Sequence, residues 1–306
     1  MFYRDVATVI DTRVKTLRGN VLGELFEGPD GAETGVVVLS GSSGRLDTER
    51  AKLFANAGTK ALALQWFGGV GQAAGICEIP LETFFSATDY LLSLGCRRVV
   101  FVGTSKGAEA ALLVAGLDSR VSAVVAINGP SVVWGNIGAG KDGAAWPERS
   151  SWSLAGRPLD FVPFVPGWQP VQRDGLVSYC ELFTHCLGNA CRSEAQIPIE
   201  AAEANILLIA GGDDAVWPSA RFAEALVKRR KDYHRSVSLF YDKGAGHRIL
   251  FPGEKTPRST LHAHGGSDEA DARLGLAAWP DVLKLLQTPD PEKFSTALTS
   301  CSGPPK

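Results

Sequence analysis

Short, wholly apolar runs alternate along this chain with amphipathic stretches, and this alternation leaves few folds open to it. Such runs predict strands buried on both faces, as in a parallel sheet covered by helices. The predicted strands lie at residues 35–40, 60–64, 98–102, 122–127, 205–210 and 236–241. The predicted helices lie at residues 46–57, 82–94, 106–116, 219–231 and 268–286. The sequence therefore predicts an α/β protein with a mostly parallel central sheet flanked by helices.

Two segments depart from this alternation. Residues 14–26 are expected to form a hairpin at the sheet edge that turns at Gly19-Asn20. Residues 131–203 are rich in Gly, Pro and aromatic side chains, so we expect a lid-like insertion over the strand ends. With 306 residues, 45% of them hydrophobic, the chain can bury one large core. We expect residues 1–306 to form one domain that contains the insertion.

Charge gives no sign of a polymeric or membrane partner. The 31 basic and 33 acidic residues are spread along the chain, with a formal net charge of -2, which argues against binding to nucleic acid or an anionic membrane. Residues 1–20 interleave charged and apolar side chains, unlike a signal peptide or a membrane span. We therefore expect a cytoplasmic protein with a small-molecule partner, and the oligomeric state stays open.

The six cysteines form no CxxC pair, so we expect reduced thiols rather than a disulfide framework. Cys180, Cys186 and Cys191 lie close to His185 in the sequence. Their spacing matches no standard zinc pattern, so no metal site is predicted.

A GxSxG motif at residues 103–107 directly follows a predicted strand and directly precedes a helix-forming run. At this sharp turn the serine is strained and exposed above the sheet, and the flanking glycines avoid Cβ clashes, so Ser105 is the predicted nucleophile. The N-terminus of the next helix points its amides at the same place, so the Lys106 N–H is expected to hold a developing oxyanion. The loop at residues 41–44 is expected to supply the second donor, with Ser42 as the preferred candidate.

A serine hydroxyl needs a general base that is itself oriented by a third group. His247 follows the last predicted strand, and Asp213 and Asp214 follow the strand before it. The C-terminal ends of parallel strands meet at one edge, where ligands bind in open α/β sheets. The chain order Ser105, Asp, His247 is that of α/β-hydrolases. By position, either aspartate could orient the histidine while its neighbour caps a turn.

Other side chains near these motifs allow both structural and functional interpretations. Lys106 and Glu109 lie three residues apart on the predicted nucleophile helix, so an ion pair is as reasonable as contact with a substrate. Tryptophans more often pack in a lid or a core, but they could also build an apolar acyl pocket. The pocket candidates are Trp66, Trp134, Trp168 and Trp217.

Beyond these motifs, the chain resembles the C-terminal catalytic domain shared by acyl-CoA thioesterases and bile acid-CoA:amino acid N-acyltransferase, a relative of the dienelactone hydrolases. The resemblance extends from about residue 15 to residue 286. Its marks are EIPLE at 78–82, GTSKGAEAAL at 103–112, AINGPSVVWG at 126–135, IPIE at 197–200, GGDDAVWPS at 211–219, GAGH at 244–247 and GGSDEADARLGLAAWPDVL at 265–283.

The resemblance implies particular roles. The family's catalytic acid matches Asp214, the second aspartate of DDxxW. The family also implies a thioester substrate, an acyl-enzyme, and release of the acyl group to water or an amino acid. Its thioesterases carry serine as nucleophile and its amino acid transferase carries cysteine, so Ser105 favours hydrolysis. Animal members carry an immunoglobulin-like sandwich before this domain, and about 35 residues precede the first predicted core strand here, too few for one.

We therefore expect a serine hydrolase that cleaves an acyl thioester of the acyl-CoA type, or a carboxylic ester, through Ser105, His247 and Asp214. Water then releases the acyl group from the enzyme through the same histidine, without cofactor or metal. Three alternatives stay open. They are an acyltransferase that passes the acyl group to an amine or alcohol, a dienelactone hydrolase-like esterase, and a non-catalytic binding protein of this fold.

Overall fold

The computed structural model describes residues 13–143, 146–190, 193–287 and 298–300. The main strands are β1 (Val14–Arg18), β2 (Leu22–Phe26), β3 (Thr34–Leu39), β4 (Lys60–Leu64), β6 (Arg98–Thr104), β7 (Val121–Ile127), β12 (Asn205–Gly211), β13 (Val237–Asp242) and β14 (Leu298–Ser300). They form one sheet in the order β1-β2-β4-β3-β6-β7-β12-β13-β14. The β1–β2 hairpin and the β2–β4 pair are antiparallel, and the remaining pairs are parallel. The predicted α/β-hydrolase architecture is confirmed.

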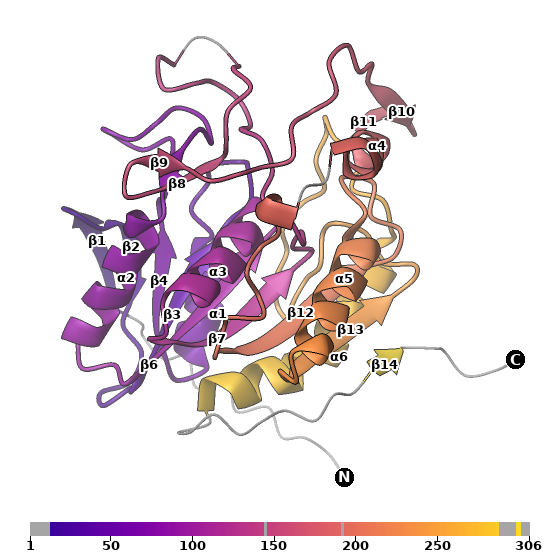
Figure 1. Ribbon diagram of the computed structural model, residues 1–306. Coiled ribbons are helices and arrows are strands. Elements are labelled where there is room, and N and C mark those ends of the chain that lie inside the picture. The colour runs from indigo at the N-terminus through magenta and orange to yellow at the C-terminus, as the bar shows by residue number, and fades with distance from the viewer. Residues whose placement is uncertain (1–12, 144–145, 191–192, 288–297, 301–306) are drawn as a thin grey trace, which may run out of the picture.

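Helices cover both faces of this sheet (Figure 1). They are α1 (Thr48–Asn56), α2 (Glu82–Ser93), α3 (Lys106–Leu117), α5 (Ser219–Asp232) and α6 (Asp268–Gln287). One apolar core joins the sheet to α2, α3 and α5, and a second joins it to α1 and α6. Successive strand residues point to opposite faces, so Val37 enters the first core while Val36 and Val38 enter the second. Burial on both faces explains why these strands appear as unbroken apolar runs in the sequence.

The described residues between 131 and 190 lie above the C-terminal edge of the sheet, where an insertion was predicted (Figure 1), and residues 197–203 run past the ends of α3 and α5 to the start of β12. They contain short elements that the sequence analysis did not predict: β8 (Trp152–Leu154), β9 (Arg157–Pro158), β10 (Val171–Arg173), β11 (Leu176–Ser178), α4 (Cys180–Ala190) and a 3-10 turn at Ser193–Ala195. β8 pairs with β5 (Ile79–Pro80), outside the main sheet. The buried side of α4 packs in an aromatic cluster with Trp134 and Trp217.

Ion pairs fasten the insertion to the loops around the sheet. The side chain of Glu78, only 2% exposed, pairs with Arg149 and, at 2.6 Å, with Lys141. Arg173 of β10 pairs at 2.6 Å with Asp213, in the loop that follows β12. Ion pairs therefore hold both the first and the second half of the insertion against loops of the main sheet.

Candidate active site

Ser105 lies at a strained turn between β6 and α3. Its φ of 57° and ψ of -121° belong to the left-handed side of the backbone map, a conformation that costs a non-glycine residue about 1–3 kcal/mol. A Cβ on Gly103 would lie 2.3 Å from the Gly107 carbonyl oxygen, and one on Gly107 would lie 2.4 Å from that of Ser40. Both glycines of the motif are therefore required by close backbone packing.

Two groups of amides border this serine. Lys106 is the first residue of α3, so its backbone N–H has no acceptor within the helix and faces the helix N-terminus. In the loop at residues 41–44, Gly41 lies directly against the serine, because a Cβ on it would come within 3.1 Å of the Ser105 Cβ. Ser42, the residue named from the sequence, is its exposed neighbour. The loop therefore brings its backbone next to Ser105.

An imidazole and a carboxylate meet beyond the ends of β12 and β13. His247 Nδ1 lies 2.7 Å from Asp214 Oδ2. Oδ1 of Asp214 also accepts the backbone N–H groups of Val216 and Trp217, and Oδ2 accepts the Ser219 hydroxyl. These hydrogen bonds fix the orientation of the Asp214 carboxyl group toward the histidine. In the tautomer whose Nδ1 donates to Asp214, Nε2 of His247 carries no hydrogen.

Asp213 has a different place. Its Oδ2 accepts hydrogen bonds from Arg173 at 2.6 Å and from the Gly266 N–H at 2.9 Å. Partial burial opposes ionisation of its carboxyl, but these hydrogen bonds prevail and lower the pKa of Asp213. Its side chain is 41% exposed. The structure thus brings Asp214, and not Asp213, to the histidine.

Asn128, which the sequence analysis missed, connects the loops of the site. Its Oδ1 accepts the Gly211 N–H at 2.8 Å, and its Nδ2 donates to the carbonyl oxygens of Gly246 and His247 at 3.1 and 3.0 Å. It is fully buried, with a φ of 48°. The preceding residue, Ile127, accepts the Ser105 N–H at 2.9 Å. The end of β7 therefore contacts both the serine turn and the histidine loop. Asn128 directly follows a predicted strand, so the sequence already placed it at the same sheet edge as Ser105.

A buried ion pair lies beneath the serine turn. Lys106 Nζ and Glu109 Oε2 are 2.6 Å apart, with side chains 1% and 0% exposed. Glu109 Oε1 also accepts the Trp134 backbone N–H and the Trp152 indole N–H. Burial lowers the pKa of Lys106 and raises that of Glu109, and their mutual attraction opposes both shifts. The carboxylate thereby joins α3 to the insertion.

A second histidine lies beside His247. The His264 ring centre is 6.0 Å from that of His247, and its backbone carbonyl accepts the His247 N–H at 2.7 Å. Burial first, and then the neighbouring cationic groups, lower the pKa of His264 to about 4. Its ring is therefore neutral near pH 7.

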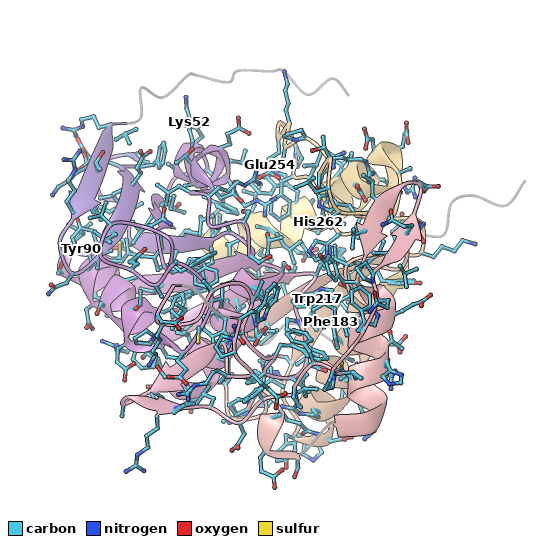
Figure 2. All side chains as sticks on the ribbon, turned by 90° about the horizontal axis from the view of Figure 1, so that it is seen from above. Lys52, Tyr90, Phe183, Trp217, Glu254 and His262 are labelled. Atoms are coloured by element: carbon cyan, nitrogen blue, oxygen red, sulfur yellow. The ribbon has the colours of Figure 1, made fainter. Side chains whose placement is uncertain are left out.

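The four candidate tryptophans do not share one pocket. Trp66, Trp134 and Trp217 are at most 2% exposed and belong to packed cores. Their large rings fill space between elements, so for these residues the structure favours the packing interpretation. Trp217 packs edge-on to His247 with 5.9 Å between ring centres, and beside Phe183 at 5.4 Å (Figure 2).

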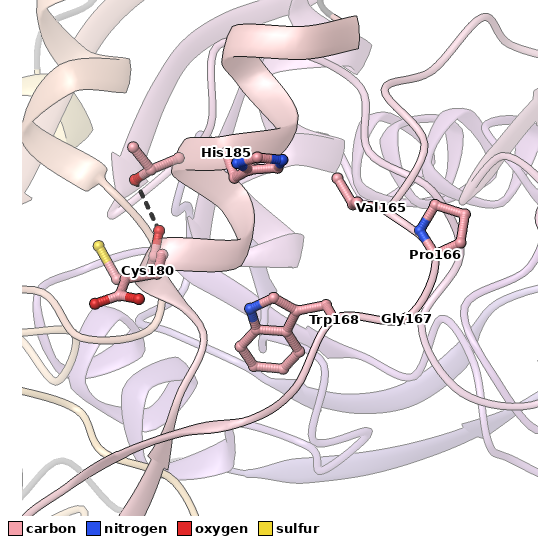
Figure 3. A pocket seen from close by; sticks show the side chains of 8 residues that line it. Val165, Pro166, Gly167, Trp168, Cys180 and His185 are labelled. Atoms are coloured by element: carbon pink, nitrogen blue, oxygen red, sulfur yellow. Dashed lines mark hydrogen bonds between the residues drawn. The ribbon is translucent and has the colours of Figure 1, made fainter.

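Trp168 instead lines a cavity of about 520 Å³ (Figure 3). The loop at residues 165–168 forms one wall, and α4 forms the other with Cys180, Glu181, Thr184 and His185. The Trp168 ring packs on Tyr179 with 5.5 Å between ring centres. The Cys180 N–H donates to the carbonyl oxygen of Ala215, the residue after Asp214. One end of the cavity is therefore tied to the loop that carries the carboxylate.

The described part of the chain has neither a membrane-spanning helix nor a metal-binding cluster. None of its helices is long and apolar enough to cross a membrane. No group of three or more His, Cys, Asp or Glu residues is placed to hold a metal ion among the residues described. Cys191, one of the cysteines considered for a metal, lies outside them.

This sheet, with a strained serine after β6 and a carboxylate–histidine pair after β12 and β13, defines an α/β-hydrolase. Residues 79–289 match the family described as "BAAT / Acyl-CoA thioester hydrolase C terminal". The chain belongs to this family, and the resemblance seen in its motifs is confirmed.

Relatives in the family include both thioesterases and acyltransferases. The chain is 30% identical to acyl-coenzyme A thioesterase 1 of Homo sapiens over 282 residues, which are 88% of this chain and 62% of that protein. It is 30% identical to acyl-coenzyme A amino acid N-acyltransferase 2 of Rattus norvegicus over 247 residues, which are 78% of this chain and 55% of that protein. The chain thus spans little more than half the length of these relatives.

Solved structures share the fold. A proposed dienelactone hydrolase from Klebsiella pneumoniae subsp. pneumoniae MGH 78578 aligns over 90% of this chain and 96% of its own, with a TM-score of 0.51 and 12% identity. The acylaminoacyl peptidase of Pyrococcus horikoshii aligns over 94% of this chain and 43% of its own, with a TM-score of 0.56 and 12% identity. At such low identities these likenesses concern the fold alone.

Proposed function

We propose that this protein is a serine hydrolase that cleaves acyl thioesters of the acyl-CoA type. The observation that carries the proposal is the 2.7 Å pair of His247 and Asp214 at the sheet edge where the strained turn presents Ser105. Membership in a family described by acyl-CoA thioester hydrolysis supports the thioester as the bond attacked.

In the proposed reaction, the Ser105 hydroxyl attacks the thioester carbonyl while Nε2 of His247 takes its proton. Asp214 stabilises the imidazolium. The Lys106 N–H and an amide of the loop at residues 41–44 hold the oxyanion. The C–S bond then breaks, and the imidazolium returns the proton to the departing thiolate. Water attacks the acyl-serine ester by the same route, which releases the carboxylic acid and restores the hydroxyl.

We place the acyl chain in the cavity beside Trp168. Its volume of about 520 Å³ lies within the range of small-molecule sites, and its tie to Ala215 brings one end near Asp214. Burial, and then the charge of Asp214, raise the pKa of Cys180, so this wall is a neutral thiol that suits apolar groups. Glu181, an acidic residue on the same wall, disfavours the anionic part of a CoA leaving group.

The test compares the wild type with Ser105→Ala on short-chain and long-chain acyl-CoAs and on p-nitrophenyl esters. We expect Ser105→Ala to lower kcat by about 10⁴-fold or more and to abolish labelling by a fluorophosphonate probe. Ser93→Ala is the control, because that hydroxyl is exposed and donates to the Tyr90 carbonyl on its own helix. Full activity in Ser105→Ala contradicts the proposal, and a wild type that neither labels nor turns over any substrate indicates a binding protein.

Transfer to an amine is the second candidate, because a relative named as an acyl-coenzyme A amino acid N-acyltransferase is 30% identical to this chain. A transferase forms the same acyl-enzyme but releases it to an amine in place of water. Product analysis with glycine, taurine or an alcohol present separates the two activities. Free acid as the sole product supports hydrolysis, and an amide or ester product supports transfer. Preference for simple esters over every acyl-CoA supports the dienelactone hydrolase-like alternative.

A further inference from the structure

A buried arginine on α1 forms a two-pronged ion pair across the domain. Arg50 Nε lies 2.6 Å from Glu254 Oε1, and one of its terminal nitrogens lies 2.8 Å from Oε2. The side chains are 6% and 4% exposed. Such paired hydrogen bonds fix both the distance and the plane of the two groups.

The same guanidinium contacts two loops of the candidate active site. Its other terminal nitrogen donates to the Thr104 hydroxyl at 2.7 Å, and Thr104 directly precedes Ser105. The terminal nitrogen that pairs with Glu254 also donates to the carbonyl oxygen of Ile249 at 3.3 Å, and Ile249 lies two residues after His247. The serine turn and the histidine loop therefore meet at one rigid, planar group.

Glu254 extends this contact along the histidine loop. Its Oε2 accepts the Phe251 N–H at 2.8 Å, and the Phe251 ring packs on the guanidinium of Arg50, 5.1 Å from its centre. The segment from His247 to Glu254 is thereby closed onto α1. Folding stability alone does not call for this arrangement, because well-packed apolar residues can replace a buried ion pair with little loss or even a gain.

We propose that Arg50 and Glu254 are positioning residues that set the separation of the Ser105 hydroxyl and the His247 imidazole. Neither touches the reacting atoms, and both act through Thr104 and the backbone of residues 249–251. The inference rests on the proposed function, in which the serine and the histidine exchange a proton. Proton transfer needs heavy atoms about 2.6–3.2 Å apart, so a small displacement of either loop lowers the rate of acylation and leaves binding of the acyl chain unchanged.

Three variants separate positioning from folding. Thr104→Val removes the acceptor on the serine turn and leaves the ion pair intact. Arg50→Lys keeps the charge without the planar fork. Arg50→Met/Glu254→Gln removes both charges of the two-pronged pair and keeps Asp47, which lies 3.9 Å from Arg50 with a side chain 10% exposed. The matched control is Arg230→Met, because Arg230 is equally buried and donates to carbonyl oxygens at the far end of α5.

Each variant is measured for kcat and KM on an acyl-CoA, for Tm, and for the rate of fluorophosphonate labelling. We expect kcat and the labelling rate to fall together, by about 10- to 100-fold in the two Arg50 variants and less in Thr104→Val, with KM within about two-fold. Arg230→Met is expected to lower Tm and to keep kcat per labelled molecule. This pattern, with the double variant recovering Tm but not kcat, supports the proposal.

Wild-type kcat per labelled molecule in both Thr104→Val and the double variant overturns the positioning role while leaving the proposed function intact. A failure of the wild type to label at Ser105 or to turn over any acyl substrate overturns both. If Arg50→Lys does not fold, Thr104→Val and the double variant still decide the question.

Discussion

His247 and Asp214 are joined by a 2.7 Å hydrogen bond although 33 residues separate them in the chain. Asp214 follows β12 and His247 follows β13. These neighbouring strands are parallel, and their last paired residues are Gly211 and Asp242. The sheet register therefore brings the two loops level with each other. The neighbouring aspartate, Asp213, points to Arg173 of the insertion instead.

Replacing each aspartate in turn should give very different results. Asp214→Asn is expected to lower kcat by about 10⁴-fold, because the amide can present its NH₂ to Nδ1 and favour the wrong imidazole tautomer. Asp213→Asn removes an ion pair that is about 40% exposed on each side and should change kcat by less than about ten-fold. Steady-state kinetics on one acyl-CoA checks both, and equal losses contradict the assignment of Asp214.

Removing one partner of the buried Lys106–Glu109 ion pair should lower the free energy of unfolding. Lys106→Met leaves a carboxylate in the core without its counter-charge, so we expect a loss of about 3–5 kcal/mol in the free energy of unfolding. Lys106→Met/Glu109→Gln removes both charges and keeps an acceptor for the Trp152 indole, so it should recover most of that loss. Urea denaturation measures both variants, and additive losses in the double variant contradict the coupling.

Replacing Trp168 should raise KM more for long acyl chains than for short ones. Trp168→Ala removes a large apolar wall of the cavity, so KM for long-chain acyl-CoAs should rise by about ten-fold while KM for acetyl-CoA changes little. Trp146 is the matched control, because it belongs to the same insertion and is 63% exposed. An equal effect of Trp168→Ala on short and long chains indicates that the acyl group binds elsewhere.

His264 should make the protein sensitive to acid. Its pKa falls from 6.5 to about 4 on folding, so between these values the unfolded chain binds a proton that the folded chain does not. Stability contributed by the neutral ring is present above pH 6.5 and is lost as pH falls toward 4. His264→Gln should therefore lose less Tm between pH 7 and pH 4.5 than the wild type. An unchanged or larger loss contradicts the burial of a neutral ring.

The sequence was most informative where periodicity and backbone geometry dominate. The structure places the six central strands, the five helices and the hairpin at residues 14–26 close to their predicted bounds. The strands were readable because strands buried on both faces must be apolar throughout. The serine turn was equally readable, since its glycines are required by contacts under 3 Å. Local patterns sufficed in these cases.

Features set by tertiary contacts were harder to predict. α4 begins where Tyr179 and Cys180 bond the Ala215 carbonyl, a contact that no local pattern announces in a Gly- and Pro-rich segment. Arg50 appears in the sequence as an ordinary helix residue, and only its partner 204 positions away explains its burial. The tryptophans show the same limit, because packing alone distinguishes Trp168 from the three that fill cores.

Asn128 offers both an amide oxygen and an amide nitrogen to its neighbours, and this polarity has a consequence for engineering. An aspartate of the same shape would have no hydrogen to give to the carbonyls of Gly246 and His247, so two lone pairs would face a repelling charge. Exchange of a single nitrogen for oxygen at this point would loosen the loop that holds the imidazole, while every atom named in the reaction stayed chemically untouched.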